Sequence, residues 1–283
     1  MKNYSISKNK NEITSIAIGG FDGMHLAHQE LFKRLDKNGA IIVIQTGYAN
    51  LTPKTTRAKY TSFPIYFYEL QLIKHLSAKD FINLIKQEFV NLKTIVVGFD
   101  FRFGINASGS TNTLKELFDG EVIVVDEFKY KGTAVHSRVI RDLISTGQIK
   151  KANQLLGKNY TIIGMHIKGQ GLGAKQFVPT INIDVKEFMY PSAGIYVTYT
   201  YINDIKYQSV TFIGHRVTTD GKFAIETHIL NKDIKDEDIN SKISIEFLCK
   251  LRENKKFELY ENLKKQILLD IKQSKDYFIK NNN

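Results

Sequence analysis

The chain has 283 residues, which is long enough for two ordinary domains with cores of their own. Hydrophobic residues make up 42% and charged residues 24%, so the composition excludes a disordered or fibrous protein. The formal net charge is +11, and the excess is spread over both halves without a run of five or more basic residues. This pattern suits anionic small ligands and disfavours a nucleic-acid arm, although a lysine-rich solvated surface explains it more simply.

Cys249 is the only cysteine, so no intramolecular disulfide can form, which fits a reducing cytosol. Residues 1–11 are polar and lack the apolar core of a signal peptide. No apolar run approaches the roughly 18 residues of a membrane span. We therefore expect a cytoplasmic protein with neither a membrane nor a nucleic acid as its partner.

The first half alternates short apolar strands with amphipathic helices. Strands are predicted at 13–18, 40–46, 65–70, 94–97 and 121–126, and helices at 25–37 and 77–90. In the second helix Ser77 is the expected N-cap, and the residues expected to face inward are Phe81, Leu84, Ile85 and Phe89. The alternation predicts an α/β domain with a doubly wound parallel sheet, in which ligands bind beyond the carboxyl ends of the strands. Gly19-Gly20 and Gly98 lie at two of those ends.

The pattern changes near Gly157, where short alternating strands replace the mixed elements. Strands are predicted at 161–168, 180–184, 194–202, 207–213, 223–230 and 243–248. A long amphipathic helix at 257–280 follows, with an apolar stripe of Tyr260, Leu263, Ile267 and Ile271. The second half therefore reads as an antiparallel β-barrel or sandwich closed by a C-terminal helix. We expect one domain at 1–157 and another at 158–283.

The segment Gly-Gly-Phe-Asp-Gly-Met-His-Leu-Ala-His at 19–28 joins the first strand to the first helix. A glycine-rich turn lets backbone N–H groups approach a phosphate chain, and the helix N-terminus adds a partial positive charge. The candidate phosphate-binding residues of this turn are Gly20, Phe21, Asp22 and Gly23.

His25 and His28 are three residues apart and share one face of the first helical turn. They can donate hydrogen bonds to phosphoryl oxygens and to a pyrophosphate leaving group, so that catalysis rests on positioning and charge stabilisation. The alternative is a tight turn capped by His25 with His28 at the surface. The glycine-rich turn before them favours the functional interpretation, and no third ligand lies near enough in sequence to favour a metal site.

The segment resembles the nucleotidyltransferase signature G-x-F-D-G-x-H-x-G-H of bacterial bifunctional riboflavin kinase/FMN adenylyltransferases. Ala27 stands where that family has glycine, which adds a methyl group beside the nucleotide. The resemblance implies that the N-terminal half has the Rossmann-like nucleotidyltransferase fold. It also implies that this half transfers AMP from ATP to FMN and releases pyrophosphate.

Residues 97–109 resemble the G-x-D-F-x-F-G-x-N-x-x-G stretch of the same family. The resemblance implies that Asn106 serves the flavin or the ATP phosphates and that Phe101 and Phe103 shape the flavin pocket. From the residues alone, Phe99, Phe101 and Phe103 alternate after a strand end. They could form a stacking wall for a flavin or adenine ring, or each could be a core residue.

Residues 137–141 resemble the S-S-T-x-I-R helix start of the family, with His136 and Arg138 as departures. Ser137 is the expected N-cap and a candidate phosphate ligand, and Arg141 lies one turn into the helix, where it can reach phosphates. Arg138 is either a further phosphate contact or a surface residue.

In the second half, a glycine-rich loop that contains Gly169 and Gly171 precedes Val-Pro-Thr-Ile-Asn at 178–182. This resembles the riboflavin kinase pattern in which the loop binds ATP and the threonine and asparagine hold Mg²⁺ and the ATP phosphates. Thr180 and Asn182 suit that role because oxygen-bearing side chains two apart on a strand face the same side. The alternative is an ordinary hairpin turn.

Two later stretches complete the resemblance. Glu226 matches the family's general base, which takes the proton of the riboflavin 5′-hydroxyl, although an outward-facing glutamate on an alternating strand is the simpler alternative. Residues 247–257 resemble the family's F-x-x-x-L-R-x-x-x-x-F tail, in which Arg252 either contacts the flavin or only caps the barrel.

We therefore expect a bifunctional transferase that phosphorylates riboflavin to FMN and adenylylates FMN to FAD, with ATP and Mg²⁺. Its expected partners are riboflavin, FMN and ATP, and a homo-oligomer is left open. One alternative is a chain that only adenylylates FMN, because Ala174 and Phe177-Val178 depart from the kinase pattern. Another is a nucleotide- or flavin-binding regulatory protein, because Ala27 and Arg138 depart from the adenylyltransferase pattern.

Overall fold

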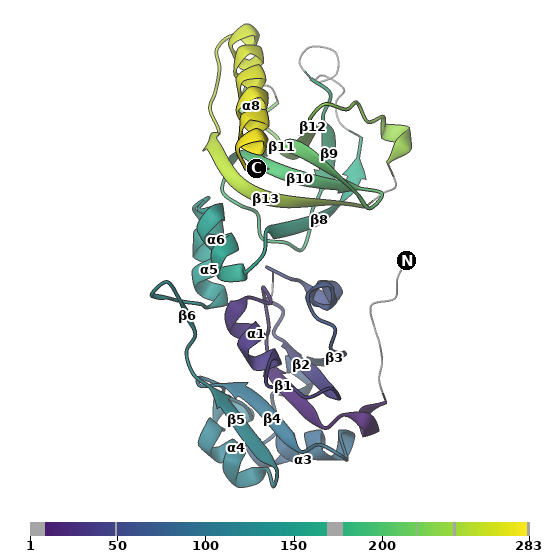
Figure 1. Ribbon diagram of the computed structural model, residues 1–283, viewed down its shortest axis with the longest axis vertical. Coiled ribbons are helices and arrows are strands. Elements are labelled where there is room, and N and C mark those ends of the chain that lie inside the picture. The colour runs from purple at the N-terminus through teal and green to yellow at the C-terminus, as the bar shows by residue number, and fades with distance from the viewer. Residues whose placement is uncertain (1–8, 49, 169–177, 219, 240–241, 282–283) are drawn as a thin grey trace. The chain divides into compact units, whose positions relative to one another are not determined.

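The computed structural model describes residues 9–48, 50–168, 178–218, 220–239 and 242–281 (Figure 1). The chain forms two compact units, Met1–Val139 and Ile140–Asn283. Each unit has its own sheet and its own hydrophobic core.

The first unit is built on a five-stranded parallel sheet with the order β3-β2-β1-β4-β5 (Figure 1). Its strands are β1 (Ser15–Gly19), β2 (Gly39–Gln45), β3 (Ile65–Glu69), β4 (Thr94–Gly98) and β5 (Glu121–Val125). Its helices are α1 (Leu26–Phe32), α2 (Leu70–Ile73), α3 (Ala78–Glu88) and α4 (Thr111–Leu117). It also has the 3₁₀ segments η1 (Lys10–Glu12), η2 (Lys54–Tyr60) and η3 (Ile105–Ala107). A separate hairpin is formed by β6 (Lys129–Tyr130) and β7 (Thr133–Ala134). The strand order reverses between β1 and β4, which are adjacent, and this reversal is where doubly wound sheets bind ligands.

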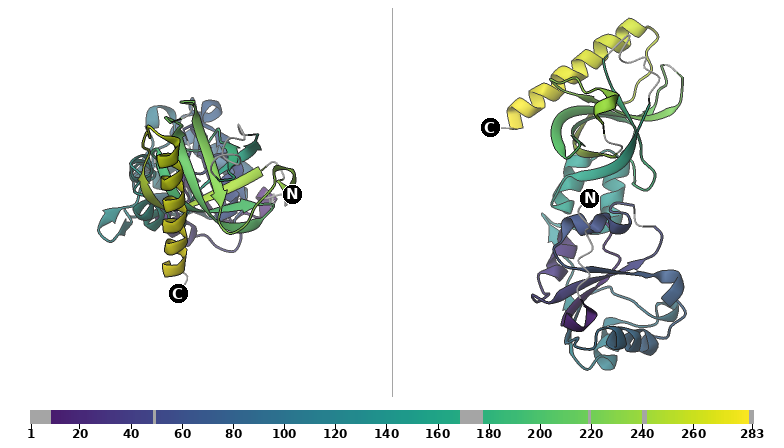
Figure 2. Two further views of the ribbon diagram at one scale, coloured as in Figure 1. Left: turned by 90° about the horizontal axis from the view of Figure 1, so that it is seen from above. Right: turned by 90° about the vertical axis from the view of Figure 1, so that its right-hand side faces the viewer.

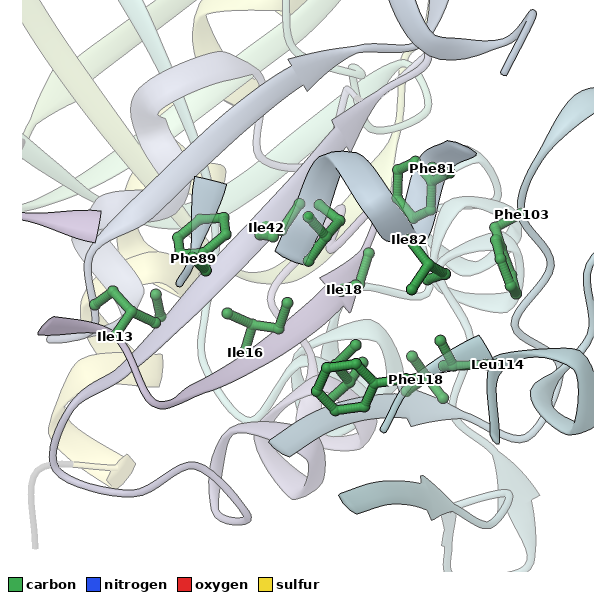
Figure 3. Packing of buried hydrophobic residues seen from close by; sticks show 14 residues of the cluster. Ile13, Ile16, Ile18, Ile42, Phe81, Ile82, Phe89, Phe103, Leu114 and Phe118 are labelled. Atoms are coloured by element: carbon green, nitrogen blue, oxygen red, sulfur yellow. The ribbon is translucent and has the colours of Figure 1, made fainter. Parts of the chain in front are cut away.

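The core on one side of this sheet forms where α3 packs on the strands (Figure 3). Ser77 caps α3 as predicted, because its Oγ accepts the N–H of Asp80 at 3.1 Å. The prediction that Leu84 faces inward is wrong, since Ile82 is buried in its place and Leu84 is only half-buried. Helix α1 is also shorter than predicted, because the chain turns after Phe32 to enter β2.

The second unit contains a closed antiparallel barrel with the order β10-β11-β12-β9-β8-β13, so of the two expected architectures the barrel is the correct one. Its strands are β8 (Tyr160–Ile167), β9 (Ile181–Asp184), β10 (Gly194–Ile202), β11 (Ile205–His215), β12 (Phe223–Ile229) and β13 (Lys242–Glu253), with the 3₁₀ segment η4 (Asp236–Asp238) between the last two. The long helix α8 (Tyr260–Asn281) packs on β10 and β11 along the side of the barrel (Figure 2). Its contact face includes Asp270, Ser274 and Phe278, whereas Tyr260, predicted to belong to the inward stripe, is 56% exposed.

Two helices precede the barrel, α5 (Ser137–Ser145) and α6 (Ile149–Leu156). Helix α6 packs on β8 and β13, and Asn153 joins it to both: its Nδ2 donates to the carbonyl of Phe247 and its Oδ1 accepts the N–H of Tyr160, each at 2.8 Å. Along the chain, the boundary between the two compact units lies at 139–140, whereas the period of the sequence changes near Gly157.

Five fully buried hydroxyl groups form a closed ring inside the barrel. Going round the ring, the Oγ atoms join Thr198 to Ser209 (2.7 Å), Ser209 to Thr200 (2.8 Å), Thr200 to Thr227 (3.0 Å), Thr227 to Thr211 (3.0 Å) and Thr211 back to Thr198 (2.8 Å). Ser209 Oγ also lies 3.0 Å from the carbonyl of Thr198, to which it can donate. Each hydroxyl can donate one hydrogen bond and accept others, so the ring and this carbonyl satisfy all five without water.

We expect Thr227→Val to destabilise the barrel although it hardly changes the shape of the side chain. The change leaves two neighbouring ring hydroxyls short of a partner in a dry interior, which costs about 1–3 kcal/mol. Denaturant unfolding followed by circular dichroism measures the loss. The matched control is Thr133→Val at an exposed strand position, and an equally small effect of both changes would contradict the role of the ring.

Candidate active sites

The turn after β1 lies at the reversal of the strand order and is held from inside the protein. Asp22 is buried, and its carboxylate accepts the backbone N–H groups of Leu51 (3.0 Å) and Thr52 (2.9 Å). The N–H of Gly23 donates to Oγ1 of Thr52 at 2.7 Å. These contacts fix the shape of the turn, and they engage two groups that the sequence pattern assigned to phosphate. The phosphate contacts of Asp22 and Gly23 stay predictions.

Arg57 holds the same turn from the other side and was missed in the sequence. Its side chain is 1% exposed, and its guanidinium donates to the carbonyls of Phe21 (3.3 Å), Gly20 (3.2 Å) and Lys54 (3.0 Å). Burial lowers the pKa of Arg57, while the charge of Asp22 opposes that shift. Arg57 lies in the aperiodic segment η2, and nothing in its local sequence indicates the contact.

Gly20 is exposed and differs from the other glycines of the turn. A Cβ atom built on Gly20 would meet no protein atom within 4 Å, and its φ lies outside the left-handed region. Neither packing nor backbone geometry therefore requires glycine at this position. An open backbone of this kind is what the close approach of a phosphate chain requires, and the phosphate contact of Gly20 stays a prediction.

His25 and His28 lie together at the start of α1, as predicted. His25 is 3% exposed and is the N-cap, with its ring nitrogen Nδ1 accepting the N–H of His28 at 3.4 Å. The two rings stack with centroids 3.5 Å apart and an interplanar angle of 18°. The rings of Phe21 and His28 pack nearly perpendicular to each other, with centroids 5.1 Å apart. His25 therefore caps the helix, as the structural alternative expected. Its ring also stacks on the ring of His28, so the two histidines form the pair that the functional interpretation expected.

The start of α5 is tied to this turn. Ser137 lies within the first turn of α5, so the prediction that it is the N-cap is wrong. Its Oγ instead donates to the carbonyl of Asp22 at 2.7 Å. The preceding His136 bonds Glu127 at 3.3 Å, which together with Lys129 lowers the pKa of that carboxyl. Arg138 is exposed and Arg141 is half-buried one turn further along α5, and the phosphate contacts of Ser137 and Arg141 stay predictions.

The loop after β4 begins at the same reversal of the strand order, but its aromatic rings do not form one stacking wall. Phe103 is buried in the core of the first unit, and Phe101 stacks on it with centroids 5.5 Å apart. Phe99 is 45% exposed and contacts the ring of His136 instead, at 6.5 Å. The core interpretation therefore holds for Phe103, and a flavin contact of Phe101 or Phe103 stays a prediction.

Asn106 lies on an exposed turn of this loop with a left-handed backbone (φ 54°, ψ 26°). Gly104 precedes it with φ 72°, where a Cβ would lie 2.7 Å from the backbone nitrogen of Ala78. The loop is thus pinned against the start of α3, and strained backbone held by its surroundings is frequent at ligand sites. The predicted flavin or phosphate contact of Asn106 is compatible with its exposure.

A second candidate site lies where β9 and β12 pair in the barrel. Asn182 is the register partner of Glu226, and Thr180 lies directly before β9. Ile181 and Ile183 are buried, so the alternation places Thr180 and Asn182 on the opposite face. The predicted ATP ligands Gly169 and Gly171 lie outside the described residues.

The donor set of this second site fits Mg²⁺. Thr180 supplies a hydroxyl oxygen and Asn182 an amide oxygen, and the described ranges hold no group of three or more His, Cys, Asp or Glu that could bind a metal. Mg²⁺ commonly keeps several waters and binds substrate phosphates with few protein oxygens. The two side chains are therefore suited to a phosphate-bound Mg²⁺ rather than to a metal held by the protein alone.

Glu226 is paired with Arg216, a residue that the sequence pattern missed. Nη1 of Arg216 lies 3.0 Å from Oε1 of Glu226. The guanidinium also makes two bonds to Asp220, Nε to Oδ1 at 3.0 Å and Nη2 to Oδ2 at 2.8 Å. Burial raises the pKa of Glu226, and the charge and hydrogen bond of Arg216 oppose the shift. The sequence signal that could have indicated this ion pair is the spacing of four residues between Arg216 and Asp220, on either side of a turn.

Arg252 does not lie open to solvent. Its guanidinium makes two bonds to Asp270 of α8, at 2.9 Å and 2.7 Å, and the carboxylate of Asp270 is nearly fully buried. The ion pair joins β13 to α8. Of the two roles predicted for Arg252, a ligand contact and a structural role at the barrel, this contact is the structural one. The flavin contact predicted for Arg252 stays a prediction.

Comparisons with known proteins agree with this two-part architecture. Residues 65–139 match the family model described as FAD synthetase, and residues 156–278 match the one described as riboflavin kinase. A bifunctional riboflavin kinase/FMN adenylyltransferase from Buchnera aphidicola (strain APS) is 29% identical, with 96% of this chain and 95% of the relative covered. Its counterpart from Bacillus subtilis is 26% identical, with 97% and 96% covered.

A crystal structure from Streptococcus pneumoniae, described as a macrolide-efflux protein, has a TM-score of 0.80 and 25% identity, and covers 94% of this chain and 97% of its own. Within the part of the chain that the structure describes, no helix is both long and apolar enough to cross a membrane. The two family models and the full-length relatives decide the assignment. The chain belongs to the bifunctional riboflavin kinase/FMN adenylyltransferase family.

Proposed function

We propose that this protein makes FAD from riboflavin in two ATP-dependent steps, one in each unit. The barrel unit phosphorylates riboflavin to FMN, and the parallel-sheet unit adenylylates FMN and releases pyrophosphate. The observation that carries the proposal is the place of the two motifs. The His25/His28 pair follows β1 at the reversal of the sheet, and Glu226 pairs in register with Asn182 in the barrel.

In adenylyl transfer, an oxygen of the FMN phosphate attacks the α-phosphorus of ATP and the bond to pyrophosphate breaks. The backbone around Gly20 is open to the phosphate chain, and the N-terminus of α1 favours its negative charge. His25 and His28 donate hydrogen bonds to the charge that develops on the phosphoryl oxygens and on the leaving group. Asn106, Ser137 and Arg141 are proposed as further contacts of the substrates.

In the kinase step, the carboxylate of Glu226 takes the proton of the riboflavin 5′-hydroxyl as that oxygen attacks the γ-phosphorus of ATP and ADP leaves. Burial with one ion pair suits a general base, because the carboxylate keeps its charge and is poorly hydrated. Thr180 and Asn182 would hold Mg²⁺ and the ATP phosphates. When bound, Mg²⁺ neutralises the charge of the phosphates.

We place the protein in the cytoplasm. Cys249 is buried in the barrel and burial raises its pKa, so it is suited to the core and not to disulfide chemistry. Both reactions need only small-molecule partners.

The central test is incubation of the protein with riboflavin, ATP and Mg²⁺, with products separated by chromatography. We expect FMN and FAD to form in sequence and pyrophosphate to appear with FAD. FAD formed from added FMN but not from riboflavin would establish a chain that only adenylylates. Binding of nucleotide without either product would establish the regulatory alternative.

We expect His28→Ala to slow FAD formation from FMN by two or more orders of magnitude, because a contact to the transition-state phosphate is worth about 3 kcal/mol. Phosphorylation of riboflavin by the same preparation is the internal control and should not change. Unchanged FAD synthesis in this variant would limit His28 to a structural role.

Gly20→Ala should leave the fold intact and still impair FAD formation. The added methyl group meets no protein atom, so the thermal unfolding midpoint should stay at the wild-type value. In the complex it occupies the space of the phosphate chain, and a displacement of about 1 Å costs on the order of 100-fold in rate. Full activity with bound ATP would contradict the assignment of this space to the nucleotide.

A further inference from the structure

The short hairpin of β6 and β7 lies in the chain between the last strand of the parallel sheet and α5. Both residues of its turn have positive φ, 48° at Lys131 and 81° at Gly132, which is the geometry of a tight two-residue hairpin turn. The N–H of Val135 donates to the carbonyl of Phe128 at 3.0 Å, so the pairing continues for one residue toward the base. An isolated hairpin of two strands is marginally stable at best, so this one depends on contacts at its base.

His136 and Glu127 are opposite each other at that base. They follow Val135 and Phe128 in the same register, and Nε2 of His136 lies 3.3 Å from Oε1 of Glu127. The pKa of Glu127 is lowered, first by this hydrogen bond and then by the one from Lys129, so the carboxylate accepts the N–H of the ring. The family pattern has serine in place of His136, and a serine side chain carries no ring nitrogen to make this bond.

His136 also connects segments that end at one edge of the sheet. Its ring contacts the ring of Phe99, which directly follows β4, with centroids 6.5 Å apart. The next residue, Ser137, begins α5 and donates from Oγ to the carbonyl of Asp22 at 2.7 Å, in the turn after β1. Glu127 follows β5. His136 and Ser137 therefore contact segments at the carboxyl ends of three strands, the edge where doubly wound sheets bind ligands.

We infer that His136 is a positioning residue of adenylyl transfer, which through its hydrogen bond to Glu127 holds the start of α5 at the carboxyl edge of the sheet. The proposed phosphate contacts Ser137 and Arg141 lie in the first turn of α5 and one turn further along. Ser137 is bonded to the turn that contains Gly20, where the phosphate chain of ATP is proposed to bind, so the positioning serves ATP. His136 needs no contact with either substrate. This inference rests on the proposed adenylyl transfer.

The consequence is a loss that falls on one substrate. Without the bond, the start of α5 is no longer held in one orientation, so the phosphates of ATP are bound less well. The side chains of His136 and Glu127 are 39% and 35% exposed, and an ion pair this exposed contributes little to stability. A residue that only supported the fold would instead lower the thermal unfolding midpoint and leave the KM values of both substrates unchanged.

The experiment measures kcat, KM for ATP and KM for FMN in FAD formation by the full chain. We expect His136→Ala to raise KM for ATP about ten-fold, less than the roughly 100-fold cost of a full 1 Å misplacement. KM for FMN and the thermal unfolding midpoint should stay at wild-type values. His136→Gln keeps an N–H donor that can reach Glu127 and should restore most of the affinity for ATP. An unchanged KM for ATP in His136→Ala, or an equal rise in His136→Gln, overturns the inference.

A double-mutant cycle tests whether the effect passes through Glu127. Glu127→Ala should raise KM for ATP as much as His136→Ala does, and the combination of both should add nothing further. Additive losses, or wild-type behaviour of Glu127→Ala, overturn the inference, because His136 would then act without its partner. Lys129→Gln is the matched control, since it removes the contact of Lys129 with the same carboxylate, at 3.2 Å, and should match wild type. An equal rise there would assign the effect to the whole hairpin and overturn the inference.

Two further measurements separate this inference from the proposed function. Phosphorylation of riboflavin reports the integrity of each preparation and should not change. Arg141→Ala should impair FAD formation, and full activity of that variant would overturn the proposed role of α5 together with this inference. A wild-type KM for ATP in His136→Ala beside an impaired Arg141→Ala overturns this inference alone. If His136→Ala does not fold, Glu127→Ala decides, because it removes the same bond.

Discussion

The parallel-sheet unit depends on two buried charges that hold one turn. The carboxylate of Asp22 accepts hydrogen bonds from the backbone N–H groups of the segment 50–52. The guanidinium of Arg57 donates hydrogen bonds to the carbonyls of Gly20 and Phe21. The turn is thereby fixed through both its donors and its acceptors, and each charge lowers the cost of burying the other. The orientation of His25 and His28 at the start of α1 follows from the path of this turn.

The barrel unit uses the same device at its own site. There Arg216 is fixed by Asp220 and contacts Glu226, the proposed general base, so an ion pair again fixes the orientation of a side chain. The difference lies in exposure: Arg57 is enclosed and acts on the backbone, whereas Arg216 lies at the edge of the barrel and acts on a side chain. Both arginines are therefore supports of a motif and not members of it.

This explains what the sequence could and could not predict. The strands, the antiparallel character of the second half, the Ser77 cap and the pairing of His25 with His28 follow from local periodicity and spacing, and the structure agrees; periodicity alone left a barrel and a sandwich open. Arg57, Arg216 and the bond from Ser137 to Asp22 depend on contacts between segments far apart in the chain or across a turn, for which no period exists. Phe103 and Tyr260 show the converse, because a regular pattern of aromatic or apolar residues does not say which of its members the core takes.

The hydroxyl ring in the barrel has a consequence for how this protein can change over evolutionary time. Its five members come from β10, β11 and β12, and each lies within hydrogen-bond distance of two others, with the carbonyl of Thr198 as a further acceptor for Ser209. A single replacement by an apolar residue strands its neighbours, whereas a joint replacement of all five would give an ordinary apolar interior. Drift at these positions is therefore coupled, and the two kinds of interior are separated by intermediates that fold less well than either.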